Sequence, residues 1–365
     1  MKASELFVGI MSGTSLDGVD AVLADFGASP WRLRHHVYQP YSRSMREQML
    51  LLQRPVENEL HHAMLAANAV AGCYASAVNE LLLQTRIKAE QIIAIGCHGQ
   101  TVRHNPQQGY SLQLCNAALL TELCGISVVS DFRSRDIAAG GNGAPLVPAF
   151  HHALFPNRSA HRVIVNIGGI SNLTSLPPKG AYFGFDCGPG NVLLDSWCEA
   201  QTGERFDADG AWAATGTIIP DLLKRLLSHP YFSQPLPKSC GREQFNLQWL
   251  NGLLSGGEAA QDVQATLLEL TVQIIAQAVS EYCRGVQEIY FCGGGARNKV
   301  LVDKLCKALP GIKTDVTDAL GINPQTLEAY AFAWLAWQTL QGKSGNLPQT
   351  TGAKGQRILG AIYQK

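Results

Sequence analysis

LFVGIMSGTSLDGVDAVLADF (Leu6–Phe26) combines an apolar run, a turn of glycines and small polar residues, and a second apolar run. HRVIVNIGGISNLTSLP (His161–Pro177) repeats this order about 155 positions later, and a third apolar run, Tyr182–Asp186, follows it. Short apolar runs joined by glycine turns are typical of β-hairpins. The recurrence predicts two halves built on one template; the alternative is a chance likeness between two hairpins.

Composition narrows the classes of protein. The chain has 365 residues, which favours two domains, and Lys+Arg and Asp+Glu both number 29. Because the basic excess of a nucleic-acid binder is missing, we expect no nucleic-acid partner. The ten cysteines include no Cys-x-x-Cys pair, which favours reduced thiols.

The N-terminal sequence and the longest charge-free stretch indicate the cellular location. Met1–Leu6 does not resemble a signal peptide, and the longest charge-free stretch, Ile137–Asn157, is broken by Gly, Pro and His. We therefore expect a cytoplasmic protein with no membrane partner. The oligomeric state stays open, a homodimer being one option.

Short β-rich runs alternate with longer helical patterns, which predicts an α/β fold. The predicted strands are Leu6–Met11, Ala21–Asp25, Ile92–Cys97, Tyr110–Leu114, Ser127–Ser130, Arg162–Ile167, Leu173–Leu176, Tyr182–Asp186, Glu288–Cys292 and Ile358–Ile362. The predicted helices are Asn58–Gln84, Asn116–Leu123, Val192–Gln201, Glu258–Arg284, Asn298–Leu309 and Pro324–Gln341. We expect one domain at residues 1–140, joined by 330–365, and a second at 141–329.

Three glycine-rich corners are candidate nucleotide contacts. Backbone N–H groups in such turns form concavities that suit phosphate, and hydroxyl groups add donors. The candidates in the first turn are Ser12, Gly13, Thr14, Ser15, Leu16, Asp17, Gly18 and Val19; those in the second are Asn166, Gly168 and Gly169. The third corner, EIYFCGGGARNKVLVDKL (Glu288–Leu305), offers Gly293, Gly294, Gly295 and Asn298 for a base or ribose. Each could also be only a tight turn, and neither a Walker A nor a G-x-G-x-x-G motif occurs.

Six segments together resemble the anhydro-N-acetylmuramic acid kinase family. They are GIMSGTSLDGVD (9–20), GCHGQTVRHNP (96–106), SDFRSRDIAAGGNGAPLVPAFH (130–151), NIGGISNLT (166–174), GFDCGPGN (184–191) and GINPQTLEAYAFAWLA (321–336). The resemblance implies a two-domain actin-like (RNase H-like) ATPase fold with duplicated mixed-sheet domains and an interdomain cleft. It also implies an enzyme of cell-wall (peptidoglycan) recycling, which uses ATP and Mg²⁺ to hydrolyse 1,6-anhydro-N-acetylmuramic acid and phosphorylate O6. The products would be N-acetylmuramic acid 6-phosphate and ADP.

One position departs from the wider superfamily of actin, sugar kinases and chaperone ATPases. Their first strand often ends in Asp-x-Gly-Thr, whose aspartate helps to place Mg²⁺, whereas this chain has Met11 there. Asp17 or Asp20, directly or through water, is therefore the candidate metal ligand.

Two carboxylates are candidate catalytic groups. Asp186 is expected to end a strand before the turn Gly188–Gly190, and the resemblance gives it the role of base; the alternative is a local Asx cap. Glu328 would orient the sugar or the water, although an acid early in a helix is also favoured by the helix dipole.

Polar residues after strand ends are candidate sugar contacts. They are His98, Gln100, Thr101, Arg133, Arg135 and Asn191, with no catalytic role for His98. An arginine could pair the lactyl carboxylate or the γ-phosphate, or the stretch from Asp131 to Asp136 could be a solvated loop. Asn142 and Gly143 are a candidate hinge. Two other functions stay open: a hexose kinase in which Asp186 deprotonates the alcohol, and an actin- or chaperone-like ATPase without a sugar substrate.

Overall fold

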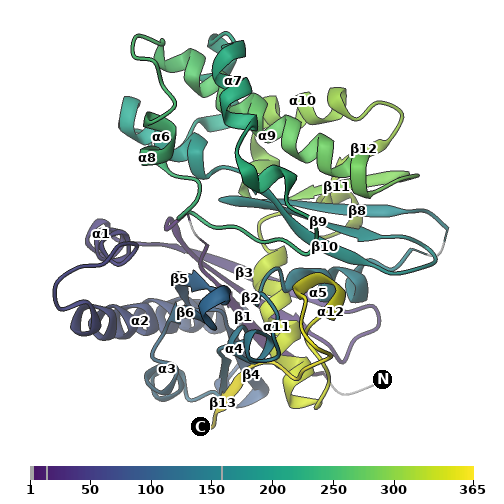
Figure 1. Cartoon of the computed structure of the whole chain (residues 1–365). Helices are drawn as coiled ribbons and strands as arrows, with labels where there is room; N and C mark the ends of the chain where they lie inside the picture. The colour runs from purple at the N-terminus through teal and green to yellow at the C-terminus, as the bar shows by residue number, and fades with distance from the viewer. Residues whose placement is uncertain (1–3, 14, 158) are drawn as a thin grey trace. The chain divides into compact units, whose positions relative to one another are not determined.

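The computed structural model describes residues 4–13, 15–157 and 159–365, which form two compact units (Figure 1). Unit 1 comprises Met1–Leu154 and Gln325–Lys365, and unit 2 comprises Phe155–Pro324. These limits differ from the predicted 140/141 and 329/330. Helix α5 (Val147–Leu154) belongs to unit 1 because its Phe150 ring packs on Tyr330 and Trp334, with centroids 5.0 and 5.8 Å away.

Unit 1 is built on a mixed sheet in the order β13-β7-β4-β1-β2-β3. Strands β1, β2 and β3 are antiparallel neighbours, and β4 and β7 run parallel to β1 on its other side. The bounds are β1 Leu6–Met11, β2 Gly18–Asp25, β3 Arg32–Pro40, β4 Ile92–Cys97, β7 Val128–Ser130 and β13 Ala361–Tyr363. A separate hairpin pairs β5 (Gln100–Asn105) with β6 (Tyr110–Leu114).

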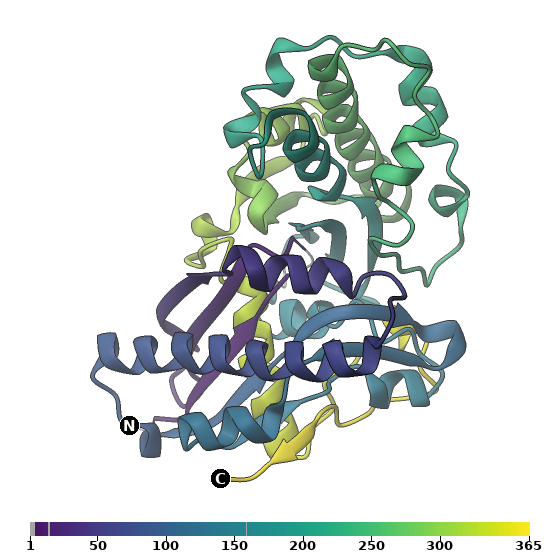
Figure 2. The same ribbon diagram turned by 90° about the vertical axis from the view of Figure 1, so that its left-hand side faces the viewer.

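Two helices cover the opposite faces of this sheet. In Figure 2, α2 (Glu59–Thr85) lies in front of the sheet and α11 (Leu327–Leu340), in yellow, behind it. On β1, Leu6, Val8 and Ile10 belong to the core that includes α2, so Gly9 faces the other side. The remaining helices are α1 Arg43–Leu51, α3 Ala117–Cys124, α4 Ser134–Ala138 and α12 Pro348–Thr351.

Helix α11 packs directly on paired glycines of the sheet. Gly9 of β1 and Gly96 of β4 are register partners. A Cβ on Gly9 would lie 1.9 Å from the Ala329 carbonyl oxygen, and one on Gly96 would lie 2.0 Å from the Phe332 carbonyl oxygen. Only glycine therefore allows the helix backbone to approach this closely.

Unit 2 repeats the same topology with a sheet in the order β10-β9-β8-β11-β12. Its first three strands are antiparallel, and β11 and β12 run parallel to β8 on the other side. The bounds are β8 Arg162–Ile167, β9 Ile170–Leu176, β10 Phe183–Pro189, β11 Glu288–Cys292 and β12 Lys313–Val316. Because β3-β2-β1-β4-β7 has the same order and directions, the predicted duplication is confirmed.

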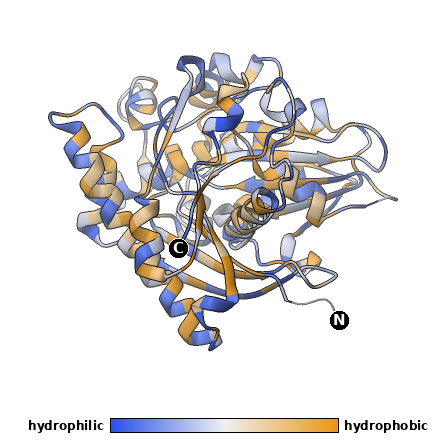
Figure 3. Cartoon of the chain, turned by 90° about the horizontal axis from the view of Figure 1, so that it is seen from below, coloured by the Kyte–Doolittle hydropathy of each residue, from blue (hydrophilic) through white to orange (hydrophobic). Residues whose placement is uncertain are grey.

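The helices of unit 2 are α6 Val192–Thr202, α7 Pro220–Leu227, α8 Leu247–Asn251, α9 Ala260–Tyr282 and α10 Lys299–Ala308. Among the described helices, α9 is long and apolar enough to cross a membrane, but 72% of its most apolar window is buried in the protein. It is the central core helix of the unit. Figure 3 shows hydrophobic and hydrophilic residues interleaved along the outer helices, as expected for helices with one buried face.

Several predicted bounds were wrong. The last strand is Ala361–Tyr363 rather than Ile358–Ile362, and α11 begins at Leu327 rather than Pro324. Strand β10 does not end at Asp186 but continues to Pro189 through an irregularity between Asp186 and Gly188. Such a bulge keeps the chain paired while it redirects one side chain.

Candidate active site

In unit 2, the second glycine turn contacts the segment that follows Asp186. The Asn191 N–H donates to the Gly168 carbonyl at 2.8 Å, and the Gly190 N–H donates to the Gly169 carbonyl at 2.9 Å. A Cβ on Gly190 would lie 2.3 Å from the Gly168 oxygen. The glycine after Pro189 is therefore required by this close backbone approach.

The third glycine corner lies against the same turn. Gly293 has a φ of +80°, and a Cβ there would lie 2.4 Å from Asn166 Oδ1. The Asn191 Nδ2 donates to the Ile167 carbonyl at 3.2 Å. A Cβ on Gly295 would lie 3.0 Å from Asn191 Oδ1. The predicted phosphate turn, the predicted base or ribose corner and Asn191 thus meet within unit 2.

The Asn298 side chain, at the third glycine corner, is used as a helix cap. Its side chain accepts a hydrogen bond from the Leu301 N–H at 3.0 Å and caps α10. A Cβ on Gly210 would lie 2.4 Å from Asn298 Oδ1, so the segment FDADG (206–210) also borders the corner. Sequence reasoning missed this segment, because it has no strand or helix period.

Asp186 is a buried carboxylate in β10, only 6% exposed. Its Oδ2 accepts a hydrogen bond from the Cys240 N–H at 3.1 Å, a contact that a local cap would not make. Burial, followed by the Asp186 charge, raises the pKa of the neighbouring Cys187 and Cys240 thiols. Both thiols stay neutral beside the carboxylate.

In unit 1, a hydroxyl and amide network supports the first glycine turn. Ser12 is 1% exposed, and its hydroxyl hydrogen-bonds to the Tyr74 hydroxyl and donates to the Gly99 carbonyl at 3.5 Å. The Gln100 Nε2 donates to the Gly13 carbonyl at 3.1 Å, and its Oε1 accepts from the Tyr41 hydroxyl at 3.3 Å. The Ser12 and Gln100 side chains therefore fix the backbone of the first glycine turn.

The other predicted residues of the first turn are placed differently. Leu16 and Val19 are buried in the core, so only their backbones can reach a ligand. Leu16 has a φ of +58°, and its N–H donates to the Gly13 carbonyl at 3.3 Å. Thr14 lies outside the described residues.

Two aspartates were candidate metal ligands. Asp17 is exposed, and its Oδ1 accepts from Ser15 Oγ at 2.6 Å and from the Gly18 N–H at 3.0 Å. The Asp20 carboxylate instead pairs His36 Nε2 at 2.7 Å. Within residues 4–13, 15–157 and 159–365, no three His, Cys, Asp or Glu are grouped to hold a metal ion. Mg²⁺ often uses only one or two carboxylates together with substrate phosphates and water, and the exposed Asp17 carboxylate fits that mode.

In unit 1, the buried His98 pairs with the partly exposed Arg133. The Arg133 Nη2 donates to His98 Nε2 at 2.9 Å, and its Nη1 donates to the Gly143 carbonyl at 2.7 Å. Burial, followed by the Arg133 charge, lowers the pKa of His98 well below its usual value. Since Arg133 can only donate, the neutral imidazole carries its proton on Nδ1.

The remaining predicted sugar contacts are more accessible. Arg135 is exposed, and Thr101 is partly buried with its Oγ1 accepting from Gln113 Nε2 at 3.2 Å. Glu328 is partly exposed in the first turn of α11.

The loop after β7 is not fully solvated. Asp136 is 0% exposed, and its carboxylate accepts from the Gly143 N–H at 2.8 Å, Asn346 Nδ2 at 2.7 Å and Thr351 Oγ1 at 2.8 Å. The Asn142 N–H donates to the Thr351 carbonyl at 2.7 Å. Asn142 and Gly143 are therefore fixed inside unit 1, and the predicted hinge at this position was wrong.

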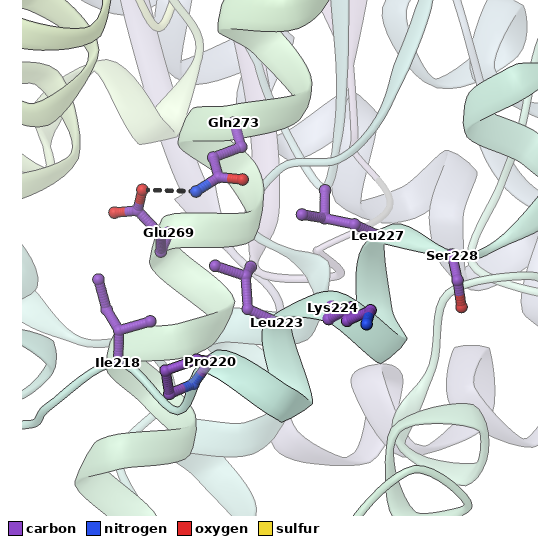
Figure 4. A pocket seen from close by; sticks show the side chains of 8 residues that line it. All are labelled: Ile218, Pro220, Leu223, Lys224, Leu227, Ser228, Glu269 and Gln273. Atoms are coloured by element: carbon purple, nitrogen blue, oxygen red, sulfur yellow. Dashed lines mark hydrogen bonds between the residues drawn. The ribbon is translucent and has the colours of Figure 1, made fainter.

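A shallow pocket on unit 2 lies between α7 and α9 (Figure 4). Its lining includes Leu223, Leu227 and Gln273, and Gln273 Nε2 donates to Glu269 Oε1 at 3.0 Å. It contains none of the predicted site residues, so it takes no part in the candidate site.

Two sheets of one topology, each opening with a glycine turn, define the duplicated α/β class of the actin-like ATPases and sugar kinases. A model of the family described as "Anhydro-N-acetylmuramic acid kinase" matches residues 5–365. The chain belongs to the anhydro-N-acetylmuramic acid kinase family, and it is an ATP-dependent phosphotransferase.

Similar proteins carry the same description. The Nitrosospira multiformis protein of that name is 58% identical over 365 residues, covering 100% of both chains. The Nitrosomonas europaea protein is 57% identical over 359 residues, covering 98% of this chain and 99% of that one. A solved structure, the activator of the 2-hydroxyisocaproyl-CoA dehydratase from Clostridium difficile with bound ADPNP, is 14% identical with a TM-score of 0.46, covering 92% of this chain and 96% of that one.

Proposed function

We propose that the chain converts 1,6-anhydro-N-acetylmuramic acid, ATP and water into N-acetylmuramic acid 6-phosphate and ADP, in the cytoplasmic recycling of peptidoglycan. The match to one kinase family from residue 5 to residue 365 carries the proposal. The buried Asp186 carboxylate, fixed by the Cys240 N–H, supports the hydrolytic half of the reaction.

Asp186 is the general base of this proposal. It takes a proton from the water that attacks the anomeric carbon, and the bond from that carbon to O6 breaks. The freed O6 then attacks the γ-phosphorus of ATP, and ADP leaves. A positioned base is worth roughly 10²–10⁴ in rate.

The glycine corners hold the nucleotide. Backbone groups of the turns at Gly13 and at Gly168–Gly169 contact phosphates, and Gly293–Gly295 approach the base or ribose. Asp17, directly or through water, would hold Mg²⁺, which supplies neutralisation of phosphate charge when it is bound.

Polar side chains, Asn191 among them, hold the sugar. Arg133 or Arg135 pairs the lactyl carboxylate of the sugar. His98, Gln100 and Thr101 contact its hydroxyl or acetamide groups. Glu328 orients the sugar or the attacking water.

The test is incubation of the purified protein with ATP and either 1,6-anhydro-N-acetylmuramic acid or simple hexoses. We expect ADP release only with the anhydro sugar, and ¹⁸O from labelled water in the anomeric hydroxyl at early times. Asp186→Asn should bind ATP and lose turnover. Release of ADP with hexoses alone, or without any sugar, would overturn the proposed function.

A further inference from the structure

The strand that carries Asp186 lies at the edge of its sheet, and a distant segment covers that edge. β10 pairs with β9 on one side only, in the order β10-β9-β8-β11-β12. Residues 231–240, here called the edge segment, supply partners on the other side. An edge strand without partners would leave its N–H and C=O groups unpaired.

The edge segment contacts Asp186 at three atoms. The Asp186 N–H donates to the Lys238 carbonyl at 3.4 Å, and the Tyr231 hydroxyl donates to the Asp186 carbonyl at 2.6 Å. The Cys240 N–H donates to the Asp186 carboxylate at 3.1 Å. The edge segment therefore fixes both the backbone and the side chain of Asp186.

Two buried side chains hold the edge segment in place. Tyr231 is 1% exposed and Lys238 is 7% exposed. The Lys238 ammonium donates to the Phe232 carbonyl at 3.2 Å and lies 4.9 Å from the Tyr231 ring centroid. It also lies 5.7 Å from the ring centroid of Phe185, the residue before Asp186. A cation held between carbonyls and aromatic faces fixes both ends of the segment.

We propose that Tyr231 and Lys238 are positioning residues for the Asp186 base, acting through the edge segment and the Cys240 N–H. This inference rests on the proposed role of Asp186. The Cys240 N–H donates to the Asp186 carboxylate within the protein itself, so the edge segment orients the base. Displacement of a reacting group by about 1 Å can cost on the order of 10² in rate.

The experiment uses the full chain with the variants Tyr231→Phe and Lys238→Met. We expect kcat with the anhydro sugar to fall about 10- to 100-fold, with the KM for ATP unchanged within about twofold. The matched controls are Tyr290→Phe, a buried tyrosine of β11, and Lys224→Met, an exposed lysine of α7; both should keep kcat. If Lys238→Met does not fold, Tyr231→Phe decides, because it removes one oxygen only.

A double variant separates positioning from general stability. If Tyr231 acts through Asp186, adding Tyr231→Phe to Asp186→Asn should not lower the small residual kcat of Asp186→Asn any further. Equal losses in both backgrounds, or a normal kcat in both single variants, would overturn the inference. An active Asp186→Asn variant would instead overturn the proposed base.

Discussion

At the scale of single residues, the buried Asp136 carboxylate ties the loop after β7 to the C-terminal segment of unit 1. Its oxygens accept hydrogen bonds from Gly143, Asn346 and Thr351. Asp136→Ala would leave these donors unsatisfied, so we expect the free energy of unfolding to fall by about 3 kcal/mol. Urea denaturation measures this, with Glu57→Ala at an exposed position as the control. Equal stability of the two variants would contradict the structural role.

Buried histidines make stability depend on pH. Burial lowers the pKa of His104 to about 4 and of His151 to about 3, and it lowers the pKa of His98 well below its usual value. Below about pH 6.5 the unfolded chain binds protons that the folded chain does not, so stability is lost as the pH falls.

The expected slope is up to about 1.4 kcal/mol per pH unit for each such histidine between pH 6 and 5. Denaturant titrations at several pH values measure it. His104→Asn should reduce the slope, and His61→Gln, on the exposed face of α2, is the control. A flat profile between pH 7 and 5 would be inconsistent with neutral buried imidazoles.

At the scale of elements, the close contact of α11 with the sheet requires that Gly9 and Gly96 have no Cβ. Gly96→Ala would place a Cβ 2.0 Å from the Phe332 carbonyl oxygen, so we expect a loss of about 1–3 kcal/mol or more. Gly72→Ala in α2 is the matched control. Its Cβ would meet nothing within 4 Å, and it should stabilise the helix by about 0.5–1 kcal/mol. Thermal melts of both variants measure the difference, and a neutral Gly96→Ala would show that the helix shifts freely.

Elements with a clear apolar pattern could be predicted from the sequence. The bounds of β1, β4, β6, β8 and β11 were correct, since each is a short run between turn residues. Strand β3 was missed because its sequence, RLRHHVYQP, is mostly polar and its strand pairing comes from β2. The end of β10 was placed too early because a bulge lets Gly188 and Pro189 stay paired.

The candidate site could be predicted only in part, because some of its contacts join residues that are far apart in the sequence. The glycine corners and Asp186 were visible as motifs. Tyr231, Lys238 and Cys240 were not, because their contacts with Asp186 join positions about 45–54 residues apart without any local pattern. Gln100 was expected to touch the sugar, and the structure adds a bond to Gly13 that its sequence position could not reveal.

At the scale of the whole molecule, the two units differ in continuity. Unit 2 is one stretch, Phe155–Pro324, whereas unit 1 needs both ends of the chain. We expect the fragment 155–324 to unfold cooperatively on its own. A chain cut after residue 324 should lose the cooperative transition of unit 1, because α11 no longer covers β1 and β4. Calorimetry of the two fragments measures this, and two full transitions in the 1–324 chain would contradict it.

The glycine pair beneath α11 also has a consequence for synthesis on the ribosome. The strands with Gly9 and Gly96 are made first, but the helix that covers them emerges only after residue 340. This face of the first sheet therefore stays uncovered until the end of translation, whereas all of 155–324 has been made before α11 is complete. We therefore expect the nascent chain to aggregate chiefly through the uncovered face of β1 and β4, until α11 packs on it.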